Sequence, residues 1–149
     1  MAFVKVAAGN NFVIGIIDPG ILTLWGTNAG MKEAFVMSEN AKDVFAGKDI
    51  AFVITTDGRL YGFGSTEHGR LPIPYEVTSP KFVSIQDDSV ILLEESGQLK
   101  AWGTGVASLV PTQLFTSKVT SISRTGTDFS ATIENGPLVQ WSSKTYTGL

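Results

Sequence analysis

The sequence has no cysteine and only one histidine among its 149 residues. The missing thiols exclude disulfide scaffolds, thiol nucleophiles and cysteine zinc sites, and a single imidazole excludes sites with several histidine ligands. Charged residues make up only 17% of the chain, with 11 basic and 14 acidic side chains and a formal net charge of −3. Because no block of basic residues is present, the electrostatic footprint of a nucleic-acid binder is missing. We therefore expect no metal, no cofactor and no nucleic-acid partner.

Long apolar runs are also missing. The apolar stretch from Phe12 to Ile17 is far shorter than the roughly 20 residues that cross a bilayer. The N-terminus lacks the basic region and the small-residue cleavage site of a secretory signal. These absences predict cytoplasmic synthesis without export and no membrane association.

What remains is the composition of a turn-rich folded domain. Hydrophobic residues make up 43% of the chain, which also has 16 glycines and 6 prolines. This balance excludes a disordered tail and a long-helix protein. The length fits one domain, residues 1–149, large enough to fold without a disulfide or metal.

An internal repeat organises the chain. Four segments align without a gap, and each has a glycine 14 positions and an aromatic residue 19 positions after an aliphatic residue. The aliphatic residues are Val6, Val44, Val83 and Ile122, the glycines are Gly20, Gly58, Gly97 and Gly136, and the aromatic residues are Trp25, Phe63, Trp102 and Trp141. The steps between the aromatic residues are 38, 39 and 39, which divides the chain into repeats of about 1–40, 41–79, 80–117 and 118–149.

Each repeat has the pattern of a small antiparallel sheet. Its middle run is short and apolar and is bounded by turn residues, as in a strand buried on both faces; these runs are 12–17, 50–55, 89–94 and 128–133. A turn signal such as Asp57-Gly58 follows, which predicts a hairpin with positive φ at both central turn positions. A blade of three strands buries both of its faces only by stacking on neighbours. The sequence therefore predicts an all-β, propeller-like array of four three-stranded blades.

Several motifs carry a family resemblance. They are VAAG at 6–9, TTDGRLYGFGSTEHGRL at 55–71 with PYEV at 74–77, and SGQLKAWGTG at 96–105 with PTQL at 111–114. The chain resembles the repeats of the regulator of chromosome condensation propellers, and its period is similar to that of the short blades of the bacterial β-lactamase inhibitor propeller. It departs from that pattern because it has four repeats, whereas relatives usually have about seven. The histidine that commonly follows V-x-x-G is also replaced, by Phe12, Ile50, Ser89 and Asp128.

The four repeat aromatics, Trp25, Phe63, Trp102 and Trp141, are expected to pack between blades. Their identical place in every repeat favours this structural role over stacking on a ligand. The single histidine, His68, is expected to lie in a surface loop, because nothing in the sequence pairs it with a nucleophile. The sequence thus predicts no catalytic residues.

The connections 26–42, 64–80 and 103–118 are the candidate binding loops, since recognition commonly resides on loops held by a rigid scaffold. Their candidate contact residues are Met31, Phe35, Met37, His68, Arg70, Tyr75, Leu109 and Phe115. An equally economical interpretation is that these side chains cover the outer edges of the blades.

Two classes of function follow. The first is a non-enzymatic protein-interaction or assembly module, with protein partners or self-association. One form of it is an accessory or decoration component of a larger particle such as a phage virion, since phage proteins carry similar short repeats. The second class, which the resemblance to the β-lactamase inhibitor propeller implies, is a soluble inhibitor or regulator that binds its target through propeller loops. Guanine-nucleotide exchange and enzymatic activity are disfavoured.

The number of repeats leaves two arrangements open, a small closed ring and an open arc. An arc would expose one flank of the first blade, at residues 2–6 and 12–17, and one flank of the fourth, at 129–133 and 138–141. Exposed apolar sheet surface invites association. We therefore expect the chain to associate in its working state.

Overall fold

The computed structural model describes residues 3–28, 30–31, 40–67, 70–74, 77–85, 89–104, 110–125 and 128–142. Within these residues, strands that are neighbours in sequence pair into four three-stranded sheets. The first two sheets are β1 (Phe3–Gly9), β2 (Phe12–Ile17) and β3 (Ile21–Gly26), and β4 (Ala41–Ala46), β5 (Ile50–Thr55) and β6 (Leu60–Gly64). The other two are β7 (Pro80–Ile85), β8 (Ser89–Glu94) and β9 (Leu99–Gly103), and β10 (Val119–Thr125), β11 (Asp128–Ile133) and β12 (Leu138–Ser142).

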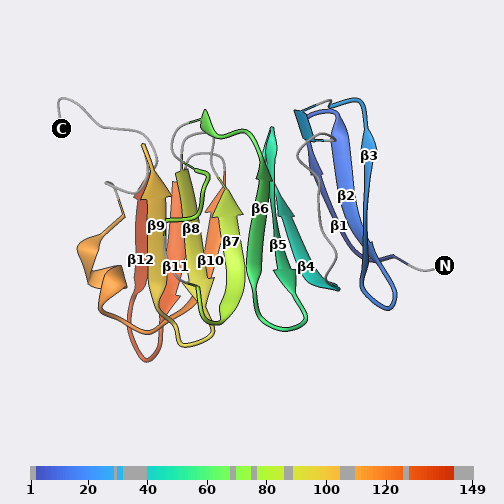
Figure 1. The fold of residues 1–149 in the computed structure, drawn as a ribbon. Coiled ribbons are helices and arrows are strands. Elements are labelled where there is room, and N and C mark those ends of the chain that lie inside the picture. Colours follow the sequence, from blue (N-terminus) through green and yellow to red (C-terminus); the bar gives the residue numbers. More distant parts are fainter. Residues whose placement is uncertain are drawn as a thin grey trace. The chain divides into compact units, whose positions relative to one another are not determined.

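The predicted fold class is confirmed. We call the sheets blades 1 to 4 in chain order; in each, the middle strand pairs with both of the others, as Figure 1 shows for blades 1 and 2. The four middle strands have the predicted bounds, because short apolar runs between turn residues define them. A 3₁₀ helix, Thr112–Phe115, precedes blade 4. In the part of the chain that the structure describes, no helix is long and apolar enough to cross a membrane.

The hairpin turns lie where they were predicted, but their conformation differs from the prediction. In blade 2, Gly58 N–H donates to the carbonyl oxygen of Thr55 at 3.0 Å, and Thr55 N–H donates to the carbonyl oxygen of Arg59 at 2.9 Å. The loop therefore has three residues, with only its last, Gly58, at a positive φ of 86°. Asp57 keeps a negative φ because a three-residue hairpin loop requires left-handed backbone only at its closing glycine.

The chain divides into two compact units. Unit 1 comprises Met1–Glu67 and Leu71–Pro80 and contains blades 1 and 2, whereas unit 2 comprises His68–Arg70 and Lys81–Leu149 and contains blades 3 and 4. Each unit has a hydrophobic core of its own.

The core of unit 1 lies between blades 1 and 2. Blade 1 contributes Phe12, Ile14 and Ile16, which alternate along β2 and therefore point to one face. Blade 2 contributes a face of smaller residues and one aromatic: Ala41, Val44, Ala51, Val53 and Phe63. An apolar face of the first blade thus covers the face of the second blade that carries the repeat aromatic.

The core of unit 2 repeats this arrangement. Ile91, Leu93 and Leu99 of blade 3 pack with the face of blade 4 that contains Ile122, Phe129, Ala131 and Val139. Leu114 of the 3₁₀ helix is fully buried in the same core. Within each unit, the second blade therefore presents its aromatic face to the blade before it.

Candidate functional site

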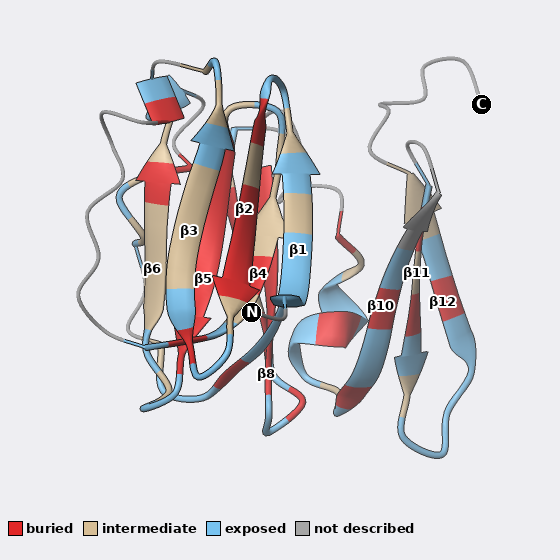
Figure 2. Ribbon diagram, turned by 90° about the vertical axis from the view of Figure 1, so that its right-hand side faces the viewer, coloured by how far each residue is buried: buried red, intermediate tan, exposed pale blue. Residues whose placement is uncertain are grey.

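One face of blade 1 is apolar and exposed. Phe3, Val6, Ile21 and Trp25 are 53%, 56%, 56% and 42% exposed. Val13 lies opposite Trp25 in the strand pairing and is half-buried. We call these five residues the exposed face of blade 1, and Figure 2 shows β1 and β3 as more exposed than β2 between them.

The centre of this face is a pair of aromatic rings. The ring centroids of Phe3 and Trp25 lie 5.5 Å apart, with an interplanar angle of 43°. Both rings lie over Gly15, where an added Cβ would be 3.3 Å from Phe3 Cδ1 and 3.4 Å from Trp25 Cη2. The missing side chain at Gly15 therefore lets the two rings lie flat enough to contact each other above β2.

Blades 2 and 3 bury the positions equivalent to Val6 and Trp25, whereas Arg59 and Gln98, at the position of Ile21, are exposed. In blade 2, the residues aligned with Val6 and Trp25 are Val44 and Phe63, each 6% exposed. In blade 3 the aligned pair is Val83, at 3%, and Trp102, at 5%. The positions of Val6 and Trp25, which are buried in blades 2 and 3, are thus open to solvent in blade 1.

The free face of blade 4 has a different chemistry. Ser123 and Ser130 hydroxyls form a 2.8 Å hydrogen bond across the strands, and the Thr132 hydroxyl lies 2.6 Å from both the Thr120 and Ser121 hydroxyls. Figure 2 shows β10 and β12 largely exposed. We call Thr120, Ser121, Ser123, Ser130 and Thr132 the hydroxyl face of blade 4.

This polarity corrects one expectation. The flank of blade 4 at 129–133 and 138–141 was expected to be an apolar surface. Strand alternation instead turns Phe129, Ala131 and Val139 into the core of unit 2 and leaves mainly hydroxyl and amide side chains on the other face. Leu138, at 57%, is the large hydrophobic residue among these that stays exposed.

The four repeat aromatics do not share one environment. Phe63 and Trp102 are buried, and Trp102 Nε1–H donates to the carbonyl oxygen of Arg70 at 2.8 Å. Trp141 is half-buried and stacks on Phe129, with centroids 5.2 Å apart and ring planes within 6° of parallel. Trp25 is 42% exposed on blade 1, so its packing between blades stays a prediction.

The candidate loop residues divide into buried and exposed positions. Met31 is 0% exposed in the core of unit 1, and Arg70 is 1% exposed. The expectation that these two side chains are displayed on binding loops is therefore wrong. Their burial fits the alternative interpretation, in which the side chains of the connections cover the edges of the blades. Phe115 is 37% exposed at the end of the 3₁₀ helix. The remaining candidates lie outside the described residues: Phe35, Met37, His68, Tyr75 and Leu109.

A spacing in the sequence could have revealed this burial. Met31, Arg70 and Leu109 follow one another at equal intervals, and each interval equals one repeat period. Each of the three also precedes a repeat aromatic by the same interval, so they are equivalent positions of the repeat. The Sδ of Met31 lies 2.8 Å from where a Cβ on Gly64 would stand, directly after Phe63. Repetition at the period of the core indicates an anchor that packs each connection onto the next blade.

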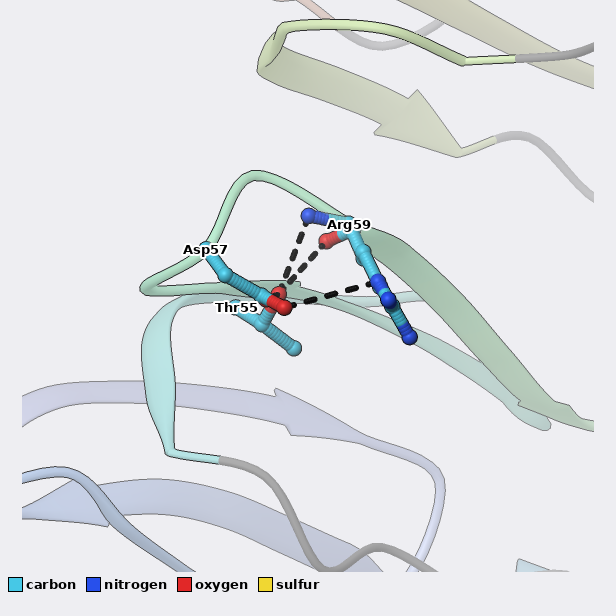
Figure 3. Close-up of polar contacts among 3 residues, drawn as sticks. All are labelled: Thr55, Asp57 and Arg59. Carbon is cyan, nitrogen blue, oxygen red and sulfur yellow. Dashed lines mark hydrogen bonds and ion pairs between the residues drawn. The ribbon is translucent and has the colours of Figure 1, made fainter.

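The most extensive polar cluster surrounds the turn of blade 2 (Figure 3). The hydroxyl of Thr55, which is fully buried, accepts the Arg59 N–H at 2.9 Å and donates to a carboxylate oxygen of Asp57. Asp57 also pairs with the Arg59 guanidinium at 3.4 Å. All these bonds close within one hairpin loop, so the cluster stabilises the turn.

Other features of the described residues offer little chemistry. An open cavity of about 250 Å³ is lined by Arg59, Leu60, Tyr61, Ile73 and Val77. Another, of about 310 Å³, is lined by Asp128, Phe129, Gln140, Trp141 and Ser142. Across the described ranges, no group of three His, Cys, Asp or Glu residues could hold a metal ion.

Comparison with known proteins defines the class. Residues 41–70 match the model of the regulator of chromosome condensation (RCC1) repeat. Among curated proteins, no sequence matches the chain. Three solved structures with 15% or 16% sequence identity align over nearly the whole chain. Yeast RCC1 (Prp20), in its complex with Kap60, aligns with a TM-score of 0.71 over 94% of this chain and 43% of its own.

Two plant receptor kinases align in the same way. The ectodomain of CR4 from Physcomitrella patens gives a TM-score of 0.73 over 98% of this chain and 41% of its own. The ectodomain of ACR4 from Arabidopsis thaliana gives a TM-score of 0.69 over 94% of this chain and 53% of its own. The chain therefore has the fold of part of an RCC1-like β-propeller, spanning about half the length of these relatives or less. The match to the RCC1 repeat model lies in its second repeat.

Proposed function

We propose that this chain is a non-enzymatic protein-binding module that engages its partner through the exposed face of blade 1. The observation that carries the proposal is the contrast between equivalent residues, with Val6 at 56% and Trp25 at 42% exposure against 6% or less for Val44, Phe63, Val83 and Trp102. These positions are buried in blades 2 and 3 and exposed in blade 1.

The energetics favour covering this face. Full burial of one large apolar side chain contributes about 1.5–3 kcal/mol, and four such side chains are more than two-fifths exposed here. Exposed apolar patches of this kind commonly mark interaction sites in soluble proteins. The exposed face of blade 1 contains no charged side chain, so it suits an apolar protein surface rather than a charged ligand.

The similar structures support a binding role for the fold. Yeast RCC1 (Prp20) was solved bound to Kap60, and Prp20p from Saccharomyces cerevisiae was studied for binding to Gsp1p and histones. At 15–16% identity these partners do not transfer to this chain. The fold supplies a scaffold, and the partner is determined by the surface grafted on it.

Two settings for such a module follow from the sequence. One is an accessory or decoration component of a larger particle such as a virion, and the other is an inhibitor that occupies a target protein. Both use the same chemistry, burial of an apolar sheet face. The identity of the captured protein distinguishes them.

The experiment is site-specific photo-crosslinking in the organism that makes the protein. A photoreactive side chain at position 21, on the exposed face of blade 1, is compared with one at position 132, on the hydroxyl face of blade 4. We expect discrete protein adducts from position 21 and few from position 132. Equal or absent adducts at the two positions would contradict the proposal.

A further inference from the structure

The turn between β11 and β12 contains an asparagine directly followed by a glycine. Both residues, Asn135 and Gly136, are exposed. We infer that Asn135 is a site of spontaneous modification, at which the side-chain amide is converted into a carboxylate. The inference concerns the turn of blade 4 alone, so it depends neither on the exposed face of blade 1 nor on the proposed function.

The reaction needs only the chain itself and water. The main-chain nitrogen of Gly136 attacks Cγ of Asn135 and loses its proton, and the side-chain nitrogen of Asn135 leaves as ammonia. The cyclic imide that results takes up water, which opens the ring at either of its carbonyl groups. The products are aspartate and isoaspartate. A glycine in the second position favours the attack because no Cβ shields its nitrogen.

The side chain of Asn135 is available for this reaction. Among the residues that the structure describes, no hydrogen bond uses its amide group. Asn28 is the contrast, because its side chain donates to the carbonyl oxygen of Asn10 at 2.9 Å and accepts the N–H of Met31 at 3.2 Å. The reacting amide of Asn135 therefore has no such contacts to break before it turns toward Gly136.

The equivalent turns of blades 2 and 3 are closed by a backbone hydrogen bond. In blade 2, Thr55 N–H donates to the carbonyl oxygen of Arg59 at 2.9 Å. In blade 3, Glu94 N–H donates to the carbonyl oxygen of Gln98 at 3.0 Å. Arg59 also has an N–H of its own, which donates to the Thr55 hydroxyl at 2.9 Å.

The turn of blade 4 is held less firmly. The aligned pair is Ile133 and Pro137, and between these two described residues the closing backbone bond is not formed. Pro137 also has no N–H to donate. What remains is the bond from Gly136 N–H to the carbonyl oxygen of Ile133, at 3.1 Å. The loss of one hydrogen bond raises the population of open turns about two- to tenfold, and opening frees the nitrogen that attacks.

Two other exposed asparagines serve as internal comparisons. Asn11 has nearly the same φ as Asn135, 58° against 56°, but its carbonyl oxygen accepts the N–H of Thr27 at 2.8 Å. Asn40 is followed by Ala41, whose N–H donates to the carbonyl oxygen of Gly20 at 2.8 Å. In both cases the next residue carries a Cβ and the backbone is tied to a neighbouring segment.

The modification changes the turn in two ways. Aspartate adds a negative charge next to Glu134, which pairs with Lys118 at 3.2 Å. Isoaspartate adds a methylene group to the main chain and so disturbs the pairing of β12 with β11. Because Val139 of β12 lies in the core of unit 2, we expect chains that contain isoaspartate to unfold at a lower temperature.

Peptide mapping by mass spectrometry tests the inference on the full chain, incubated in mildly alkaline buffer. Conversion of the amide raises the mass of a peptide by about 1 Da, and chromatography separates aspartate from isoaspartate. The residue after an asparagine changes the rate by itself. Each rate in the folded chain is therefore divided by the rate of the same residue in guanidinium chloride, so that the ratio reports the protection by the fold.

We expect Asn135 to react at least about tenfold faster than Asn11 or Asn40 in the folded chain, and the fold to protect it at most about tenfold. Asn135→Gln, which keeps the amide but lengthens the side chain, should abolish the mass increase at this position. Pro137→Gln supplies the N–H and the residue found in blade 3, and should increase the protection of Asn135 about two- to tenfold. Circular dichroism establishes that both variants keep the fold.

Two results would overturn the inference. One is an Asn135 that stays intact in the folded chain while it converts in guanidinium chloride. The other is a fold that protects Asn135 as strongly as it protects Asn11. Unchanged protection in a folded Pro137→Gln variant would overturn the structural cause, because the missing hydrogen bond would then not determine the rate.

Discussion

The indole Nε1–H of Trp102 donates a 2.8 Å hydrogen bond to the carbonyl oxygen of Arg70, and both residues are buried in unit 2. The bond joins the repeat aromatic of blade 3 to the anchor residue of the connection that precedes it. Pairing a buried donor with a buried acceptor avoids the cost of leaving either one unsatisfied. The bond therefore ties this connection to blade 3 through its backbone.

Trp102 should therefore contribute strongly to stability. We expect Trp102→Ala to lower the free energy of unfolding by about 3–5 kcal/mol, through the cavity and the lost burial. Trp102→Phe keeps most of the ring volume but removes the donor, and should cost about 1–3 kcal/mol. Urea denaturation measures both values. An unchanged midpoint for Trp102→Ala would show that the side chain is not packed and would reopen a role in stacking on a ligand.

Trp25 should behave differently although it occupies the same repeat position. It is 42% exposed and contacts Phe3, so its removal leaves no closed cavity. We expect Trp25→Ala to cost at least about 2 kcal/mol less than Trp102→Ala. Urea denaturation at low protein concentration, where association is negligible, measures this difference. Equal losses would mean that Trp25 is covered in the isolated chain.

Met31 is expected to be a core residue. Its side chain is fully buried beside Phe63, so Met31→Ala should cost about 2–5 kcal/mol. Phe115→Ala is the comparison, because Phe115 comes from a candidate loop but is 37% exposed. Thermal unfolding should show a clearly larger fall for Met31→Ala. The reverse order would restore Met31 as a displayed contact residue.

Gly58 and Gly97 have similar backbone dihedral angles, but substitution by alanine should destabilise the fold to different degrees at the two positions. Gly58 and Gly97 have φ of 86° and 90°, which costs an L-residue about 1–2 kcal/mol. A Cβ on Gly58 would meet only the Thr78 carbonyl oxygen, at 4.0 Å, whereas one on Gly97 would lie 2.5 Å from Lys118 Cγ and 3.1 Å from the Val119 carbonyl oxygen.

We therefore expect Gly58→Ala to cost about 1–2 kcal/mol, from the backbone alone, and Gly97→Ala to cost more. Denaturant unfolding of the two variants gives the comparison. A Gly97→Ala variant as stable as Gly58→Ala would show that Lys118 moves aside freely.

The sequence was sufficient to predict the blades because their signals are local. Apolar runs such as 50–55 end at turn residues, and the period repeats them in register. The turn conformation was mispredicted at Asp57, because the same Asp-Gly signal serves loops of two and of three residues.

Exposure was harder to predict because repetition hides it. Trp25 and Trp102 look equivalent in sequence, yet one is exposed and the other buried, since burial depends on whether another blade covers the face. The serines and threonines of blade 4 carried a usable signal. At the positions where blade 1 has Phe12, Ile14 and Ile16, blade 4 has Asp128, Ser130 and Thr132, which marks a face not built for burial.

The most direct test of the central claim, that the exposed face of blade 1 is covered in the working state, uses the absence of cysteine. Ile21→Cys and Leu138→Cys each give a single thiol at a position 56% or 57% exposed. The rate of alkylation is measured for the dilute purified chain and in intact cells of the source organism. The account predicts that the two thiols are alkylated at similar rates in dilute solution. In cells, it predicts that Ile21→Cys is labelled at least about tenfold more slowly than Leu138→Cys, a ratio that corresponds to about 1.4 kcal/mol of protection. Equal labelling of the two thiols in cells would contradict it.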